Sequence, residues 1–146
     1  MNYKEIFYPP LALFIWTNIL FFVLAFARSS MLRKKVVSME YFKVFKNGQL
    51  SDWATAVTRN IANLFEVPML FYVIIIFTII IARFNNADIP NEMLYLAWAY
   101  VILRVLHSIV HITFNHVMTR FAFYLLSNVT LMGMWAMFYS TYYLGK

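Results

Sequence analysis

Four long apolar stretches divide the chain, with polar segments between them. They cover about residues 6–27, 53–83, 92–114 and 121–144. Each is as long as the roughly 20 residues that an α-helix needs to cross the hydrocarbon core of a membrane. The pattern therefore predicts four transmembrane helices.

Residues that favour helix ends and turns lie at the limits of these stretches. Pro9 and Pro10 stand at the start of the first span, where a helix tolerates a missing N–H. Ser51 and Asp52 precede the second span and are good N-cap residues. The segment 84–91 is short and contains asparagine and proline, so we expect the second and third spans to be antiparallel neighbours. These signals predict an all-α membrane protein, a bundle of four transmembrane helices with up-down topology.

The composition agrees with a membrane protein. Of the 146 residues, 63% are hydrophobic and only 12% are charged, whereas a soluble domain has roughly 25% charged residues. Four spans occupy more than half of the chain, so we expect residues 1–146 to form one domain. The absence of cysteine from the sequence excludes a disulfide, a thiolate metal site and a sulfur nucleophile belonging to the protein.

The distribution of charge predicts the orientation in the membrane. The net charge of +6 comes from residues that lie mainly between spans and form no basic soluble module, so we expect no nucleic-acid partner. Because the loops 28–52 and 115–120 are basic, the positive-inside rule predicts that both are cytoplasmic and that both termini lie outside. The short loops favour a bacterial inner membrane, with membrane lipids around the protein.

Polar and ionisable side chains recur at helical spacing inside two of the spans. In the second span these are Arg59, Asn63 and Glu66. In the third span they are Arg104, His107, Ser108 and His111. Residues three, four and seven positions apart share one face of a helix. Since charge in a membrane is costly, we expect both stripes to face the interior of the bundle or a wet cavity.

Counting along the antiparallel helices pairs two of these residues. Glu66 lies fourteen residues beyond Asp52, or about 21 Å along its helix, and Arg104 lies a similar distance before Arg120. We therefore predict an ion pair between Glu66 and Arg104 at the floor of a polar cavity, with Arg59 nearer its mouth. A purely structural pair that sets the register of the helices is the alternative.

Three further features bear on the site. Pro68 deprives the carbonyl of Leu64 of its usual partner, which predicts a kink beside the polar stripe. His107 and His111 are four residues apart and could ligate one metal ion, but they lack third and fourth ligands unless Glu66 joins them. We therefore expect no metal, and we expect His111 to lie near the mouth of the cavity.

Two segments and one arginine resemble a known family. The second span contains Arg59–Glu66, RNIANLFE, and the third contains Arg104–Ser108, RVLHS, with Arg120 sixteen residues after Arg104. This pattern resembles the MAPEG superfamily, membrane proteins of eicosanoid and glutathione metabolism that include microsomal glutathione transferases, leukotriene C4 synthase and microsomal prostaglandin E synthase. The resemblance extends over all four spans in hydropathy.

The resemblance implies a homotrimer in which glutathione sits between neighbouring subunits near the cytoplasmic face. By match of position, the residues implied to bind glutathione are Arg59, Asn63, Glu66, Arg104, Ser108, His111 and Tyr124. Arg120 is implied to stand beside the sulfur as the catalytic residue. Arginine suits the carboxylates of the tripeptide, and Glu66 suits its ammonium group. The positive charge of Arg120 and the following helix N-terminus would favour the thiolate, which is the nucleophile.

The chain also departs from the family pattern. His111 stands where family members commonly have tyrosine, and Phe121 stands where the prostaglandin synthase has serine. The first hypothesis is a glutathione-dependent transferase or peroxidase that acts on hydrophobic electrophiles or lipid hydroperoxides from the bilayer. The alternative is a non-catalytic lipid-binding or scaffold protein on the same trimeric frame.

Overall fold

The computed structural model describes residues 4–44 and 50–144, and the elements it contains there are helical. In chain order they are η1 (Glu5–Phe7), α1 (Tyr8–Arg33), α2 (Tyr41–Val44), α3 (Asp52–Phe65), α4 (Pro68–Phe84), α5 (Asn91–Ile112), α6 (Val117–Tyr139) and the π-helical turn η2 (Ser140–Leu144). The predicted all-α class is confirmed.

Four helical segments are long and apolar enough to cross a membrane. They are Glu5–Arg33, Asp52–Phe84, Asn91–Ile112 and Val117–Leu144. The number of spans is as predicted, but two limits differ. α1 continues six residues beyond the predicted end at 27; there the guanidinium of Arg28 lies 5.6 Å from the ring centre of Phe42, and Arg33 is exposed. α6 begins at Val117 instead of 121, because the side chain of His116 accepts a hydrogen bond from the N–H of Thr119 and caps the helix there.

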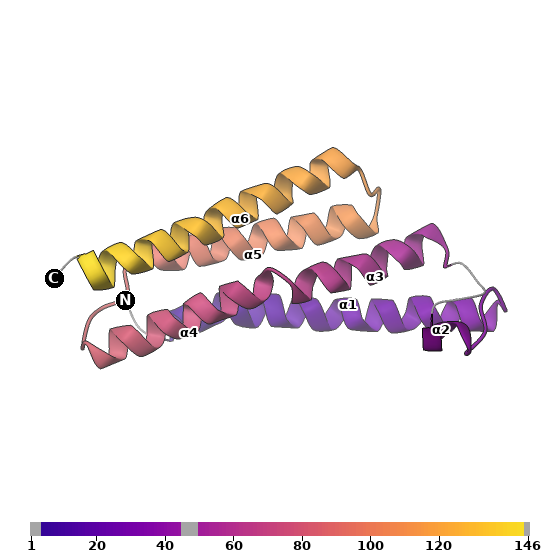
Figure 1. Cartoon of the computed structure of the whole chain (residues 1–146), viewed down its shortest axis with the longest axis horizontal. Coiled ribbons are helices and arrows are strands. Elements are labelled where there is room, and N and C mark those ends of the chain that lie inside the picture. The colour runs from indigo at the N-terminus through magenta and orange to yellow at the C-terminus, as the bar shows by residue number, and fades with distance from the viewer. Residues whose placement is uncertain (1–3, 45–49, 145–146) are drawn as a thin grey trace.

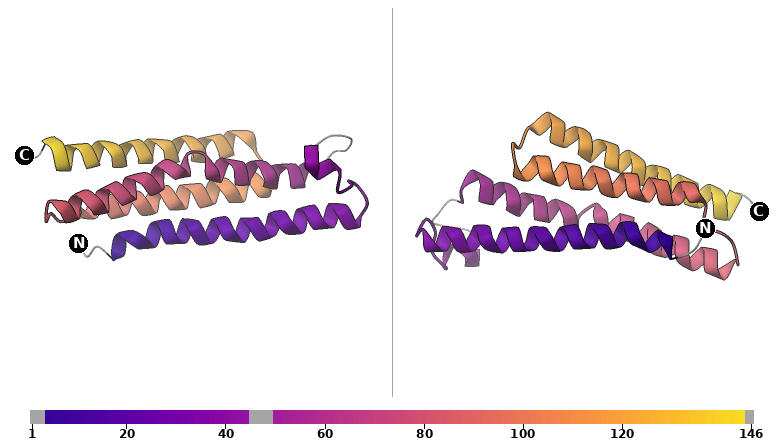
Figure 2. Two further views of the ribbon diagram at one scale, coloured as in Figure 1. Left: turned by 60° about the horizontal axis from the view of Figure 1, so that its bottom comes forward. Right: turned by 180° about the vertical axis from the view of Figure 1, so that it is seen from behind.

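The helices pack side by side in an elongated bundle (Figure 1). α5 and α6 form one close pair, and α1 packs against both α3 and α5. The start of α1 and the end of α6 lie at one end of the bundle, and the α5–α6 connection lies toward the other, as the two views in Figure 2 also show. The buried positions of α1 include Leu13, Leu20, Leu24 and Ala27. Their spacing of seven, four and three residues explains why one face of α1 meets the bundle.

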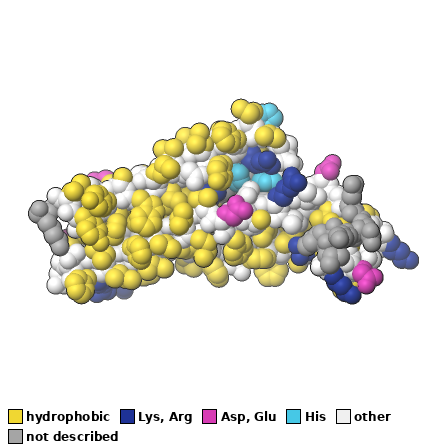
Figure 3. Space-filling model, in the orientation of Figure 1, with side chains coloured by type: hydrophobic (Ala, Val, Ile, Leu, Met, Phe, Trp, Pro, Cys, Tyr) yellow, Lys and Arg dark blue, Asp and Glu magenta, His cyan; other side chains and the backbone are white. Residues whose placement is uncertain are grey.

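Large apolar side chains cover the outside of the bundle. Phe22 is 77% exposed and Phe84 is 85% exposed, and Figure 3 shows hydrophobic side chains over most of one face. Lipid chains are as apolar as these side chains, so in a membrane no hydrophobic driving force would bury the side chains inside the bundle. The surface agrees with the hydropathy of the spans.

The predicted second helix, 53–83, is broken into two. α3 ends at Phe65, Glu66 has φ −86° and ψ −97°, and α4 starts at Pro68 (Figure 1). Proline lacks an N–H and clashes with the preceding turn, but it fits the first position of a new helix. The predicted kink at Pro68 is therefore confirmed, and it divides the helix of the second span into two.

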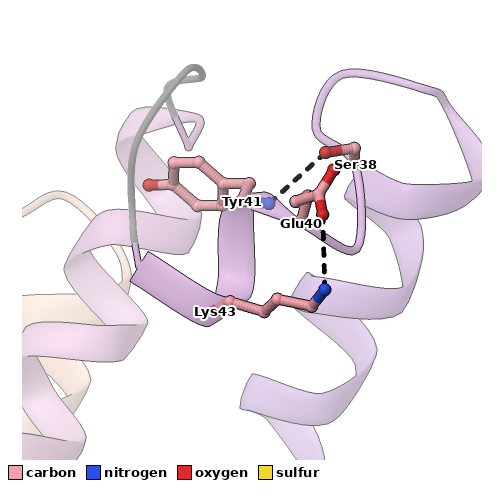
Figure 4. Close-up of polar contacts among 4 residues, drawn as sticks. All are labelled: Ser38, Glu40, Tyr41 and Lys43. Atoms are coloured by element: carbon pink, nitrogen blue, oxygen red, sulfur yellow. Dashed lines mark hydrogen bonds and ion pairs between the residues drawn. The ribbon is translucent and has the colours of Figure 1, made fainter.

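The segment after α1 was predicted to be a loop over 28–52, and its described part is more ordered than that. A short helix, α2, follows, where the N–H of Tyr41 donates to the Oγ of Ser38 at 3.3 Å and the Nζ of Lys43 lies 3.3 Å from the Oε1 of Glu40 (Figure 4). Residues 45–49 of the predicted loop lie outside the described residues. Ser51 caps α3 as predicted, since its Oγ accepts a hydrogen bond from the N–H of Ala54.

Candidate functional site

A polar pocket lies where the start of α3 faces the α5–α6 connection. Its volume is about 190 Å³, and it is lined by Asp52, Thr55, Ala56, Arg59, His111, Asn115 and Arg120. These residues come from α3, the last turn of α5, the connection and the first turn of α6. Figure 3 shows histidine, basic and acidic side chains gathered in one region of this face, whose left part is mainly hydrophobic. The structure thus brings together three predicted site residues, Arg59, His111 and Arg120.

Arg120 is held at the pocket by two side chains. Its Nη1 donates to the Oδ1 of Asn115 at 2.7 Å and lies 3.3 Å from the Nε2 of His111. A guanidinium only donates, so Nε2 must be the acceptor and His111 must be neutral with its proton on Nδ1. Asn115 has a φ of 48°, a left-handed conformation that asparagine tolerates. Within the described chain, Nε and Nη2 of Arg120 have no hydrogen-bond partner.

The position of Arg120 differs from the prediction. It was expected immediately before the fourth span, but it is the fourth residue of α6, in the first turn. The cause is the earlier start of the helix at the His116 cap. The unpaired N–H groups of the α6 N-terminus therefore lie beside Arg120, and both favour an anion.

His107 anchors the backbone of Arg120. Its Nδ1 lies 2.9 Å from the carbonyl oxygen of Arg120 and must donate, because a carbonyl oxygen only accepts. The ring is 5.7 Å from that of His111. The two histidines do not form a metal site with a third ligand, since the described residues contain no group of three His, Cys, Asp or Glu that could hold a metal ion. The sequence predicted that His107 belongs to the polar stripe of the third span and offered it as a metal candidate, but did not reveal this role.

Arg104 is buried, with 1% of its surface exposed. Its Nε donates to the Oη of Tyr100 at 3.1 Å, and its guanidinium carbon lies 5.3 Å from the ring centre of Tyr100 and 5.1 Å from that of Tyr124. Cation–π contacts of this kind stabilise a desolvated cation. Nη1 and Nη2 have no partner within the described residues.

The predicted ion pair between Glu66 and Arg104 is wrong for the single chain. Glu66 is exposed, while Arg104 is buried against aromatic rings and has two unpartnered nitrogens. The break before Pro68 explains the difference, because Glu66 follows the last residue of α3 and does not continue the helical face of Arg59. Asn63 is half-buried, and neither it nor Glu66 lines the pocket.

Ser108 makes a contact that the sequence did not reveal. Its Oγ donates to the Oδ1 of Asn60 at 3.1 Å, and both residues are fully buried. The bond joins α5 to α3. Asn60 stands at helical spacing with the buried Val57 and Leu64, so a polar residue on the apolar face of α3 was the available signal.

Tyr124 completes the polar cluster behind the pocket. It is half-buried, faces the guanidinium of Arg104, and its ring is 6.0 Å from that of His107. Arg104 and Ser108 precede His111 on α5 by seven and three residues, so the predicted residues of this helix share one face. Arg104, Ser108 and Tyr124 do not line the pocket itself.

Four apolar spans with buried polar side chains between them define the class of protein: it is an integral membrane protein with a helical transmembrane bundle. The model of the MAPEG family matches residues 6–140, so the chain belongs to the MAPEG family. Comparison with curated proteins gave no match, and comparison with solved structures gave none either.

Proposed function

We propose that the protein is a membrane-bound glutathione-dependent transferase or peroxidase that acts on hydrophobic electrophiles or lipid hydroperoxides. The observation that carries this proposal is the pocket that gathers Arg59, His111 and Arg120 at one end of the bundle. Membership of the MAPEG family supports glutathione as the co-substrate. No metal takes part in this proposal.

Arg120 is the proposed catalytic residue. Its Nε and Nη2 carry no hydrogen bond in the described chain, so they are available to a glutathione sulfur in the pocket. A close fixed positive charge and a helix N-terminus both stabilise a thiolate. In a transfer reaction, the sulfur forms a bond to the electrophilic atom and the leaving group departs with its electron pair. In a peroxidase reaction, two glutathione molecules become the disulfide while the hydroperoxide is reduced to an alcohol and water.

The remaining predicted residues are proposed to bind the rest of glutathione. Arg59 lines the pocket and suits a carboxylate. Arg104 has two unpartnered nitrogens for a second carboxylate. The proposed contacts from Asn63, Glu66, Ser108, His111 and Tyr124 follow the family pattern, with Glu66 beside the ammonium group.

We propose that a neighbouring subunit of a homotrimer completes the site. The pocket of about 190 Å³ is smaller than the roughly 300–1,000 Å³ of a typical small-molecule site. Glu66 is exposed and Asn63 half-buried outside this pocket, so both are accessible to a ligand held by another copy. The proposal includes one domain over 1–146 with up-down spans, in a bacterial inner membrane with both termini outside.

The test is a titration of the purified protein with glutathione, followed by the ultraviolet absorbance of the thiolate. We expect saturable binding and a thiolate signal in the wild type, and loss of most of the thiolate signal in Arg120→Gln. Arg83→Gln is the matched control, because Arg83 is in the last turn of α4 at the other end of the bundle and should leave the signal unchanged.

The outcome of the titration also distinguishes the proposed enzyme from the alternative of a non-catalytic protein. Failure to bind glutathione at millimolar concentration would end the enzyme proposal. Binding without any thiolate signal in the wild type would favour a non-catalytic lipid-binding or scaffold protein.

A further inference from the structure

A second, larger cavity lies at the end of α1, apart from the polar pocket. It has a volume of about 670 Å³ and is lined by Phe26, Ala27, Ser30, Met31, Lys34, Val36, Leu50, Ser51 and Trp53. A smaller cavity of about 180 Å³ adjoins it, shares Phe26, Ser30 and Lys34, and adds Ser29 and Arg33. We refer to the two together as the α1-end cavity. None of its residues lines the polar pocket.

The walls of the α1-end cavity combine two chemistries. Its apolar side chains include Phe26, which is 68% exposed, and Trp53, which is 41% exposed. Its polar part consists of the hydroxyls of Ser29 and Ser30 and the cations of Arg33 and Lys34. No carboxylate lines it. Such a site suits a ligand with an apolar chain and an anionic head.

The carbonyl groups at the C-terminal end of a helix usually repel an anion, but those at the C-terminal end of α1 are largely compensated. The carbonyls of Ser30, Met31 and Leu32 accept hydrogen bonds from the N–H groups of Lys34, Val36 and Lys35 at 3.0–3.1 Å. These carbonyls are therefore occupied, and the nearby cations compensate the negative end of the helix dipole. The hydroxyls of Ser29 and Ser30 form no side-chain hydrogen bond within the described chain.

The place of the cavity in the fold identifies the source of the ligand. Arg33 and Lys34 stand at the end of an apolar span, where the hydrocarbon core gives way to headgroups. Trp53 is at the start of the next span, and tryptophan is enriched at this interface. The cavity is thus at the depth where a phospholipid presents its phosphate.

We propose that the α1-end cavity binds an anionic phospholipid. The phosphate and headgroup lie against Ser29, Ser30, Arg33 and Lys34, and an acyl chain follows Phe26 along the outside of α1. The charge complementarity between two cations and an anionic head carries this choice of occupant. The inference does not depend on glutathione chemistry.

The test uses the full-length protein in a neutral detergent, titrated with dioleoylphosphatidylglycerol while the melting temperature is recorded. Dioleoylphosphatidylcholine and inorganic phosphate are the comparison ligands. We expect a saturable rise in melting temperature with phosphatidylglycerol and not with the two comparison ligands, because a ligand that binds the native state stabilises it. Arg33→Gln/Lys34→Gln should weaken the apparent affinity roughly 30-fold, the effect of two cations next to anionic lipid.

Two variants act as controls. Lys35→Gln/Lys43→Gln removes the same charge from the same end of the molecule, but neither residue lines the cavity. It should weaken binding by about threefold or less, because exposed charges that do not contact the lipid are screened by salt. Ser30→Leu places a larger apolar side chain at a position that lines both parts of the cavity, without changing the charge, and should strongly reduce the effect of phosphatidylglycerol.

Four results would overturn the proposal. Equal weakening by the two double variants would indicate general charge attraction, and an equal rise with inorganic phosphate would indicate an ion site. A normal lipid response in Ser30→Leu would place the lipid elsewhere. A changed oligomer mass by light scattering in Ser30→Leu, without any lipid response in the wild type, would show that a second copy of the chain occupies the cavity.

Discussion

His111, which the family resemblance marked as a departure, lies directly against the proposed catalytic arginine. Because the Nη1 of Arg120 donates to it, His111 acts as a neutral acceptor. A tyrosine hydroxyl could accept the same hydrogen bond, but it would not gain a positive charge on acidification. With histidine at this position, the hydrogen bond from Arg120 depends on pH.

Replacing His111 with glutamine tests this role, since glutamine keeps an acceptor oxygen that does not titrate. Acidification of the wild type should protonate His111, remove the acceptor and repel Arg120. We therefore expect the thiolate signal of bound glutathione to fall more steeply below neutral pH in the wild type than in His111→Gln. At pH 8 the wild type and His111→Gln should give the same thiolate signal. Identical pH profiles would contradict the proposed coupling.

The buried hydrogen bond between Ser108 and Asn60 makes a separate prediction about stability. Ser108→Ala and Asn60→Ala should each destabilise the protein, and the double variant should be less destabilised than the sum. We expect a coupling of about 0.6 kcal/mol, the average for hydrogen bonds between transmembrane helices, and of no more than about 1.7 kcal/mol. The coupling is obtained from the free energies of unfolding of the wild type and the three variants in mixed micelles. The pair Thr58→Ala and Ser127→Ala, whose hydroxyls bond to carbonyls of their own helices, should show additive effects.

At the scale of elements, the break between α3 and α4 determines where the polar residues of the second span lie. α3 carries Arg59 to the pocket, whereas Glu66 falls in the break and is exposed. A continuous helix would have kept both residues on one face. The break at Pro68 therefore separates Arg59 and Glu66, which their helical spacing had predicted to share one face.

Pro68→Ala should restore the missing N–H and let the carbonyl of Leu64 accept it. We expect amide hydrogen exchange across residues 64–70 to slow, because a regular helix protects these groups. Pro9→Ala is the matched control, since Pro9 is in the first turn of α1, a position where a helix tolerates proline. Unchanged exchange in Pro68→Ala would mean that packing, and not proline, maintains the break.

At the scale of the whole molecule, the polar groups form two layers between α3, α5 and α6. The pocket carries Arg59, His111 and Arg120, and the buried layer behind it carries Arg104 and Ser108. His107 connects the layers through the backbone of Arg120. The proposed homotrimer would add the exposed Glu66 of another copy to this arrangement. The α1-end cavity is separate and shares no lining residue with the pocket.

The sequence by itself determined the four spans, the Ser51 cap and the kink at Pro68. These features depend on interactions within a few turns of one helix: hydropathy over about 20 residues, a side chain that caps its own helix, and a missing N–H. Helical spacing also identified the polar faces that contain Arg59 and His111.

Only the tertiary structure decided which groups are partners. Counting residues gave Glu66 and Arg104 the same depth, yet Arg104 contacts Tyr100 and Tyr124, and Glu66 is exposed. Depth follows from the rise per residue, but contact also requires the rotation of each helix about its axis. That rotation comes from side-chain packing between distant parts of the chain and, for Glu66, from the loss of helical register at the break.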